Sequence, residues 1–174
     1  MKMDKVAGSG NDCYMTPRYA IKPILTYLDK FNTIWCPFDT SESRYVELLS
    51  TNHKVIHSHI AEGADFFKVS PPDCDCIVSN PPYSLKTDVL EKLFKLGKPF
   101  AMLVGVVGLF ESQARFNMFK DNKFELMYFN KRVSFLKSYQ DEKPALNPPF
   151  SSVYICHNVL PKQIVFEAID KGDV

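Results

Sequence analysis

The sequence has no apolar run of membrane-spanning length, and its N-terminal stretch lacks the apolar core of a secretion signal. Its five cysteines are odd in number, and their spacing matches no disulfide framework. These absences exclude a membrane-spanning or disulfide-stabilised protein and predict a soluble protein of a reducing cytoplasm. Cys74 and Cys76 form a Cys-x-Cys pair without a second pair at metal-site spacing, so we expect buried strand cysteines and no metal.

Neither sign of charge predominates, because 21 basic and 20 acidic residues leave a net charge of +1. This balance excludes a protein that binds nucleic acid through its total charge. The segment 112–140 differs, since it holds only two acidic residues against six basic ones, which are Arg115, Lys120, Lys123, Lys131, Arg132 and Lys137. The local excess predicts either contact with phosphates or a solvated helix face, and composition favours neither.

The remaining composition is that of a folded protein. A hydrophobic content of 45% and a charged content of 24% exclude a disordered chain. A length of 174 residues is enough for one domain with a single core. The polar, glycine-containing residues 1–11 predict a mobile N-terminal segment, followed by a single domain over residues 12–174.

Apolar periodicity predicts helices that alternate with strands along most of the chain. Thr16 is expected to cap the first helix, with Pro17 at its first position. The apolar face of that helix is formed by Ile21, Ile24, Leu25 and Leu28. Further helices are expected at 43–50, 87–96 and 112–122. Strands are expected at 33–38, 54–59, 64–69, 75–79, 100–107, 124–135, 152–157 and 163–167.

This alternation predicts an α/β fold of the Rossmann-like kind, in which two helical layers cover a mostly parallel sheet in a three-layer α/β/α arrangement. A proline-rich loop, and not a helix, joins the strands expected at 124–135 and 152–157. We therefore expect these two strands to be antiparallel and to form one edge of the sheet. Ligands of such folds bind at the carboxyl ends of the strands, so the residues that follow the first, second and fourth strands are the candidate site residues.

The most informative motif follows the strand at 75–79, where the chain reads Asn80-Pro81-Pro82-Tyr83. Two prolines fix the backbone and remove two amide donors, so this stretch must run extended with its carbonyl groups turned to a ligand. The Asn80 side-chain oxygen and the Pro81 carbonyl can accept the two hydrogens of a planar amine, while Tyr83 stacks on its ring. This grip favours a pyramidal nitrogen whose lone pair faces an electrophile.

An isolated sequence of this kind could also be a turn that only ends a strand. Its position directly after a buried strand in a β/α series favours a catalytic site over a turn. We therefore interpret residues 80–83 as the site at which a methyl group is transferred to an exocyclic amino nitrogen.

From roughly Tyr14 to His157 the chain resembles the class I N6-adenine DNA methyltransferases, especially the small Dam-like phage enzymes, whose catalytic motif matches residues 80–83. The resemblance implies a methyltransferase fold, S-adenosyl-L-methionine as cofactor, and a bacterial or phage-infected host cell. The segment Asp65-Phe66 is similar to the family's Asp-Phe element. By this resemblance Asp65 faces the adenine of the cofactor.

Two other stretches are expected to contact the cofactor by resemblance. The N-terminal Thr-Pro element of the family contacts the methionine part of the cofactor, and its counterparts here are Tyr14, Thr16 and Pro17. After the second strand, where the family places an acid for the ribose hydroxyls, this chain reads His57-Ser58-His59. Either Ser58 replaces that acid or Glu62 reaches back, and the two histidines are expected to be ordinary polar residues at a strand end.

The loop after the first strand departs from the family, which usually reads acidic-Pro-Phe-x-Gly-x-Gly. This chain keeps Pro37 and Phe38 but lacks the leading acid and both glycines, which normally let the backbone approach the ligand closely. A glycine-poor branch of the family carries an Asp and a later Ser in this loop, and Asp39 and Ser43 fit that branch. Asp39 is then expected to pair with the ammonium group of the cofactor.

On the acceptor side, residues 130–135 and 149–152 are similar to the Arg-x-x-Phe and Pro-Phe-x-Ser stretches of the phage enzymes. The resemblance implies that Lys131 and Arg132 bind the substrate. Phe135 could stack on a base that is taken out of the duplex, as base-modifying enzymes require.

These observations predict a methyltransferase that acts on an exocyclic amino nitrogen, the N6 of adenine in DNA. RNA adenine and the N5 of a protein glutamine fit the same motif, although the basic segment favours a nucleic acid. A catalytically silent, methyltransferase-like binding protein is a further alternative, because the cofactor loop lacks its glycines. A chain of this length leaves almost no room for a separate target-recognition domain, so we expect the loop at 138–149, a homodimer or a partner protein to supply recognition.

Overall fold

The computed structural model describes residues 14–174, and the segment 1–11 that was predicted to be mobile lies outside the described residues. Within the described part, none of the helices is long and apolar enough to span a bilayer. The helices are α2 (Arg18–Leu25), α3 (Arg44–Leu49), α4 (Lys86–Leu96) and α5 (Gln113–Asp121), with short 3-10 helices η1 (Ile60–Glu62) and η2 (Tyr83–Leu85). The strands are β1 (Thr33–Cys36), β2 (Lys54–His57), β3 (Cys76–Ser79), β4 (Phe100–Gly105), β5 (Glu125–Phe129), β6 (Ser152–His157) and β7 (Ile164–Glu167).

The seven described strands form one sheet in the order β2-β1-β3-β4-β6-β5-β7. Strands β2, β1, β3 and β4 are parallel neighbours, and β5 and β7 are parallel to each other. Strand β6 is antiparallel to both β4 and β5. The predicted mostly parallel α/β sheet is therefore confirmed.

The expected position of the antiparallel strand was wrong. Strand β6 lies inside the sheet between β4 and β5, and the edge strand is β7, which is parallel to β5. The loop after β5 lets the chain return antiparallel, as predicted, but β6 fills the space between β4 and β5 instead of extending the edge. Strand β7 then adds beside β5 and closes that side of the sheet.

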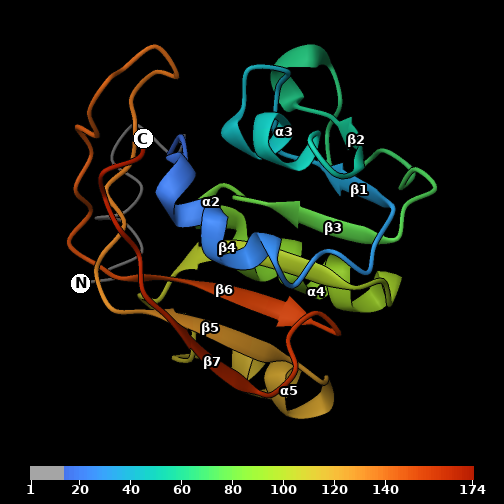
Figure 1. Cartoon of the computed structure of the whole chain (residues 1–174). Coiled ribbons are helices and arrows are strands. Elements are labelled where there is room, and N and C mark those ends of the chain that lie inside the picture. Colours follow the sequence, from blue (N-terminus) through green and yellow to red (C-terminus); the bar gives the residue numbers. More distant parts are fainter. Residues whose placement is uncertain (1–13) are drawn as a thin grey trace.

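Alternation along the strands divides the core into two layers. In β3, Cys76 and Val78 pack in a cluster with α2 and α3, whereas Ile77 packs in a second cluster with α4 and α5. Strands β4 and β6 divide their side chains in the same way, because successive side chains point to opposite faces. Figure 1 shows α2 in front of the sheet and α4 behind it, which confirms the three-layer α/β/α arrangement.

Three local expectations differ from the structure. Residues 64–69 form a turn and no strand, because the Asp65 carboxylate accepts the amide of Phe67 and its carbonyl accepts the amides of Lys68 and Val69. Strand β5 ends at Phe129, and the chain then leaves the sheet. Pro17, and not Thr16, is the N-cap of α2, and Thr16 is used by the site described below.

The parallel strands β1 to β4 point to the left in Figure 1. At that edge they meet the first described residues and the loop between β5 and β6. The motif after β3 therefore lies where three chain segments that are far apart in the sequence come together.

Candidate active site

The side chain of Asn80 is held in one orientation directly after β3. Its amide nitrogen donates hydrogen bonds to the carbonyl oxygen of Tyr14, at 2.7 Å, and to Oγ1 of Thr16, at 3.0 Å. Because a backbone carbonyl can only accept, the amide nitrogen must face Tyr14 and the oxygen must point away. Asn80 Oδ1 is buried and has no hydrogen-bond partner among residues 14–174. A buried acceptor without a partner is costly, so this atom is a candidate for accepting a hydrogen bond from a ligand.

Tyr83 lies in a buried aromatic cluster at the end of the motif. Its ring centroid is 5.2 Å from that of Tyr14, 5.6 Å from Phe150 and 6.1 Å from Phe135. Its hydroxyl lies 3.2 Å from Oγ of Ser152 in β6. Burial raises the pKa of Tyr83 far above its ordinary value, so the phenol stays neutral. The motif is therefore anchored to β6 through its tyrosine.

The tyrosine cluster also depends on Gly105, the last residue of β4. A Cβ atom at this position would lie 2.7 Å from the Phe150 ring and 3.2 Å from the Tyr83 ring. Only a glycine lets both rings pack against β4 at this distance. Sequence reasoning missed this glycine, because Tyr83 and Phe150, its neighbours in space, are 22 and 45 residues away along the chain.

A pocket of about 250 Å³ opens beside Asn80 at the carboxyl ends of β1, β2 and β3. Its apolar walls come mainly from aromatic side chains, and the Phe38 and Phe66 ring centroids lie 4.9 Å apart. The residues that line it are Tyr14, Met15, Pro37, Phe38, Thr40, His59, Ile60, Ala64, Asp65, Phe66, Phe67, Asn80, Pro82, Leu85 and Tyr139. Flat apolar walls with a few convergent polar groups are typical of a small-molecule site.

Seven of the predicted site residues line this pocket, namely Tyr14, Pro37, Phe38, Asp65, Phe66, Asn80 and Pro82. The pocket thus brings the motif after β3 together with the loop after β1 and with the Asp-Phe turn. Asp65 is fixed there, because its Oδ1 accepts the amide of Phe67 at 3.0 Å. Seven others, Thr16, Pro17, Asp39, Ser43, Ser58, Pro81 and Tyr83, do not form part of its lining.

His59 is a pocket residue that sequence reasoning did not single out. Its Nδ1 accepts the amide of Ala61 at 3.0 Å, which places the proton of the neutral ring on Nε2. The signal in the sequence was its place just after β2, where strand ends line ligands. Ser58 is directed elsewhere, since its Oγ accepts the indole nitrogen of Trp35 at 3.0 Å. Glu62 lies outside the lining, with its carboxylate 3.9 Å from Nδ1 of His57.

Asp39 is buried behind the loop that follows β1. Both of its carboxylate oxygens accept hydrogen bonds from serine hydroxyls, one from Ser43 and one from Ser79. Burial raises the pKa of Asp39 from 3.8 to about 6, although the two serine hydrogen bonds oppose that shift. Ser43 also caps α3 by accepting the amide of Tyr45 at 3.1 Å. The polar atoms of this cluster thus bind one another, and the expected pairing of Asp39 with a cofactor ammonium stays a prediction.

The three residues expected to bind substrate differ in their exposure to solvent. Lys131 and Arg132 are exposed just after β5. Phe135 is fully buried, its ring centroid lies 5.1 Å from that of Tyr14, and its backbone pairs with Leu146. A base cannot reach the Phe135 ring in this conformation, because the aromatic cluster covers it. Stacking of a base on Phe135 therefore requires the cluster to open.

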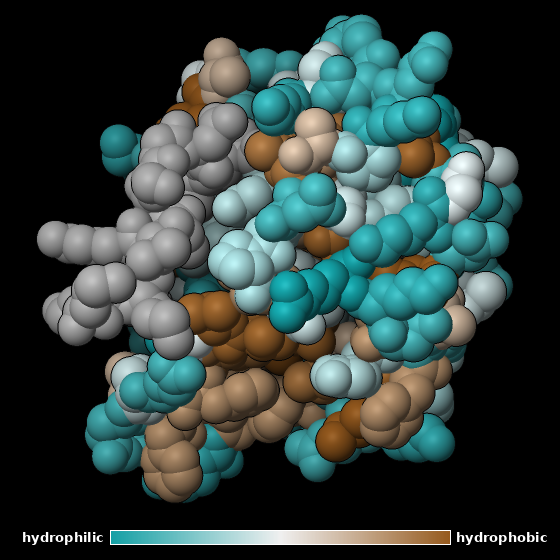
Figure 2. Space-filling view, turned by 90° about the vertical axis from the view of Figure 1, so that its left-hand side faces the viewer, coloured by the Kyte–Doolittle hydropathy of each residue, from teal (hydrophilic) through white to brown (hydrophobic). Residues whose placement is uncertain are grey.

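Figure 2 shows the face of the molecule at the carboxyl ends of β1 to β4. Hydrophilic side chains dominate its upper half, and apolar side chains gather in its lower half. A smaller hollow of about 100 Å³ is lined by Tyr83, Gly105 and Phe150. Two basic side chains, Lys86 and Arg115, line it and donate to the carbonyl oxygens of Val107 and Gly108. The motif is thus flanked by two separate spaces.

Among residues 14–174, no group of three or more His, Cys, Asp or Glu side chains could hold a metal ion. Cys74 and Cys76 are both buried, as the sequence predicted. Burial raises the pKa of both thiols, which keeps them protonated.

No family model matches the chain, and no curated protein matches it. Among solved structures, the chain is similar to one described as a modification subunit of a type I restriction enzyme from Vibrio vulnificus. The TM-score is 0.48 and the sequence identity is 11%. The similarity covers 95% of this chain and 46% of the other, so this chain spans about half the length of that protein.

Proposed function

We propose that this protein is an S-adenosylmethionine-dependent methyltransferase that acts on an exocyclic amino nitrogen, the N6 of adenine in DNA. The observation that carries the proposal is the orientation of Asn80. Its amide nitrogen is occupied by Tyr14 and Thr16, while its oxygen is buried and has no hydrogen-bond partner within residues 14–174. An oxygen held in this way is suited to accept a hydrogen from an amine.

The side chains of the pocket fit the cofactor. The Phe38 and Phe66 rings offer apolar faces to a purine, and the Asp65 carboxylate can accept hydrogens from its amino group. His59 offers a donor from Nε2, because its Nδ1 is occupied by the amide of Ala61. When bound, S-adenosylmethionine supplies an electrophilic methyl group on a sulfonium centre.

The chain's own residues supply positioning and electrostatics for the acceptor. Asn80 Oδ1 accepts one hydrogen of the amine, and the Pro81 carbonyl is expected to accept the other. Two acceptors on one planar amine favour a pyramidal nitrogen and expose its lone pair. Neither Pro81 nor Pro82 carries an amide hydrogen that could compete for these acceptors.

The surface beside the motif supports a nucleic acid as acceptor. Lys131 and Arg132 are exposed after β5, and their cations are open to solvent. Basic side chains in such positions can meet phosphates, which supply most of the affinity of nucleic-acid complexes. A glutamine side chain in a protein would gain less from these charges.

Calorimetric titration with S-adenosylmethionine and with its demethylated product tests the proposal. Saturable binding to the wild type is expected, with weaker binding to Phe66→Ala, because Phe66 forms an aromatic wall of the pocket. Phe116→Ala is the matched control, since Phe116 is exposed on α5 away from the pocket. No binding at millimolar cofactor, with and without DNA, would instead indicate a catalytically silent binding protein.

A further inference from the structure

We infer that the loop at residues 137–146 belongs to the cofactor site, with Tyr139 as a cofactor-binding residue and Arg44 as the residue that positions it. The inference rests on the proposed function. The other pocket residues lie before α2 or between β1 and α4, but Tyr139 reaches the pocket from a loop between β5 and β6. Neither Tyr139 nor Arg44 belongs to a motif that the sequence suggests for cofactor binding.

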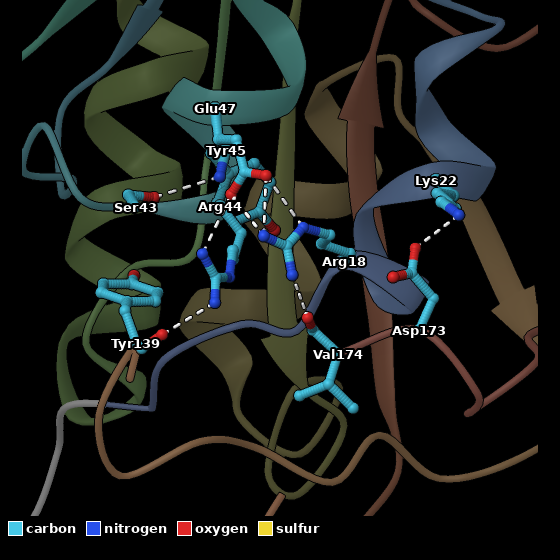
Figure 3. Close-up of polar contacts among 9 residues, drawn as sticks. All are labelled: Arg18, Lys22, Ser43, Arg44, Tyr45, Glu47, Tyr139, Asp173 and Val174. Atoms are coloured by element: carbon cyan, nitrogen blue, oxygen red, sulfur yellow. Dashed lines mark hydrogen bonds and ion pairs between the residues drawn. The ribbon is translucent and has the colours of Figure 1, made fainter. Parts of the chain in front are cut away.

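Arg44 holds the backbone and the ring of Tyr139 together. Its Nη2 donates to the carbonyl oxygen of Tyr139 at 2.7 Å, and its guanidinium carbon lies 5.7 Å from the centroid of the Tyr139 ring. Figure 3 shows the arginine extending from α3 to the loop. An arginine suits this task, because its planar group can donate in a fixed direction while it lies over an aromatic face.

Arg44 is itself fixed by a second pair of contacts. Its Nη1 donates to Oε2 of Glu47 at 3.0 Å, and Arg18 Nη2 binds the other oxygen of Glu47 at 2.7 Å. Partial burial raises the pKa of Glu47, but the hydrogen bonds from Arg18 and Arg44 outweigh this effect and leave the pKa below its ordinary value. The side chain of Glu47 is 43% exposed, so these ion pairs contribute little to global stability. Their main effect is on the orientation of Arg44.

The rest of the loop is ordered by contacts that do not involve Arg44. The Asp141 carboxylate accepts the backbone amides of Lys137 and Ser138, at 3.1 and 2.9 Å. At the base of the loop, Phe135 and Leu146 exchange backbone hydrogen bonds. Loss of the Arg44 contact should therefore release the docking of Tyr139 without unfolding the loop.

The same loop also reaches the catalytic motif. Phe135 at its base lies in the cluster around Tyr83, with 6.1 Å between the two ring centroids. The loop thus contacts the pocket through Tyr139, and the residue at its base, Phe135, contacts the Tyr83 ring. The Asn80 amide is held by Tyr14 and Thr16 and not by this loop. Removal of the Tyr139 ring should therefore weaken cofactor binding while Asn80 keeps its orientation.

Calorimetric titration of the full chain with S-adenosylmethionine and S-adenosylhomocysteine tests the inference. Tyr139→Ala should raise the dissociation constant about tenfold, the size expected for a lost aromatic contact, whereas Tyr139→Phe should change it less than about twofold. Arg44→Ala and Arg44→Lys should weaken binding by several-fold, since Lys cannot reproduce the fork. Lys143→Ala, an exposed position on the same loop, is the matched control and should bind as the wild type does.

The double variant Arg44→Ala, Tyr139→Ala separates positioning from a general structural effect. If Arg44 acts through Tyr139, the double variant binds no more weakly than Tyr139→Ala alone. Additive losses, or wild-type affinity in Tyr139→Ala, would overturn the inference while leaving the proposed function intact. If the wild type binds neither ligand, both the inference and the proposed function fail.

Discussion

Asn80 and Asp39 follow two neighbouring strands, β3 and β1, and their polar atoms are in opposite situations. The Asn80 oxygen is buried without a hydrogen-bond partner among the described residues, whereas both oxygens of Asp39 are occupied by serine hydroxyls. Asn80 borders the pocket, and Asp39 does not. The comparison teaches that burial alone does not separate the two groups. Their hydrogen bonds do, since those of the Asp39 carboxylate are complete and the Asn80 oxygen has none, which is why we propose Asn80 for the ligand-binding role.

Removal of the Asn80 amide should have the largest effect. Asn80→Ala is expected to lower the rate of methyl transfer by about 10²- to 10³-fold, the size seen when one preorganised hydrogen-bonding group is removed from an active site. The fold should remain, because Asn80 follows the end of β3 and belongs to neither of the two core clusters. Single-turnover assays at saturating cofactor measure the rate, and Asn52→Ala, exposed before β2, is the control. A near-normal rate in Asn80→Ala would remove the amide from the mechanism.

Asp39→Asn should change the pH dependence of stability. The folded state binds the Asp39 proton more tightly than the unfolded state does, since the pKa rises from 3.8 to about 6 on burial. Stability therefore falls as pH increases from about 4 to about 6, and the shift of about two pKa units corresponds to a loss of about 3 kcal/mol. Asn at this position removes the charge and with it this loss.

Urea unfolding at pH 4.5 and pH 7 measures that effect. The difference in unfolding free energy between Asp39→Asn and the wild type should favour the variant more strongly at pH 7 than at pH 4.5. Asp73→Asn, at an exposed position, controls for the removal of a surface carboxylate. If the unfolding free energies of the wild type and Asp39→Asn changed with pH in parallel, burial would not raise the pKa of Asp39 as described.

Thr16→Val tests the hydrogen bond that orients the Asn80 side chain. Valine keeps the shape of threonine but removes the acceptor that receives the Asn80 amide at 3.0 Å. We expect the rate of transfer to fall about 3- to 10-fold, as for the loss of one net hydrogen bond, with cofactor affinity unchanged. Thr16→Ser, which keeps the hydroxyl, should restore the rate. Weaker cofactor binding with an unchanged rate would instead support the cofactor contact that the sequence predicts for Thr16.

The smallest effects are expected at Lys131 and Arg132. Each replacement by Ala should weaken binding of duplex DNA a few-fold and lower the slope of log affinity against log salt by about 0.9 for each lost phosphate contact. Lys54→Ala, exposed at the start of β2 on the opposite edge of the sheet, is the control. Salt slopes that match the wild type would place the DNA elsewhere on the surface.

The strands that carry the site were predictable, because β1, β3, β4 and β6 are short apolar runs bounded by turn residues. The motif after β3 was predictable for the same reason, since its prolines and its place in the β/α series are local features. The turn at 64–69 was missed because an Asp65 side chain competes with strand formation by binding its own backbone. Local propensity also predicted Thr16 as the helix cap, whereas its hydroxyl oxygen accepts a hydrogen bond from Asn80, 64 residues away.

The remaining parts of the pocket depend on contacts that no local pattern records. The sequence places His59 at a strand end, and only the structure shows that it lines the pocket. Tyr139 enters the pocket from a loop about 60 residues beyond Asn80, and Arg44 binds its carbonyl oxygen there. Phe135 matched a family stretch, yet packing with Tyr14 and Tyr83 buries it.

The most direct test of the central claim is to identify the methylated atom. The purified protein is incubated with labelled S-adenosylmethionine and, separately, with duplex DNA, RNA and a glutamine-containing peptide, and the digested products are analysed by mass spectrometry. We predict N6-methyladenine in the DNA sample, formed by the wild type and lost in Asn80→Ala. Label in RNA or peptide alone would keep the amine-binding role of Asn80 and change the acceptor, and label in no sample, despite measurable cofactor binding, would contradict the claim.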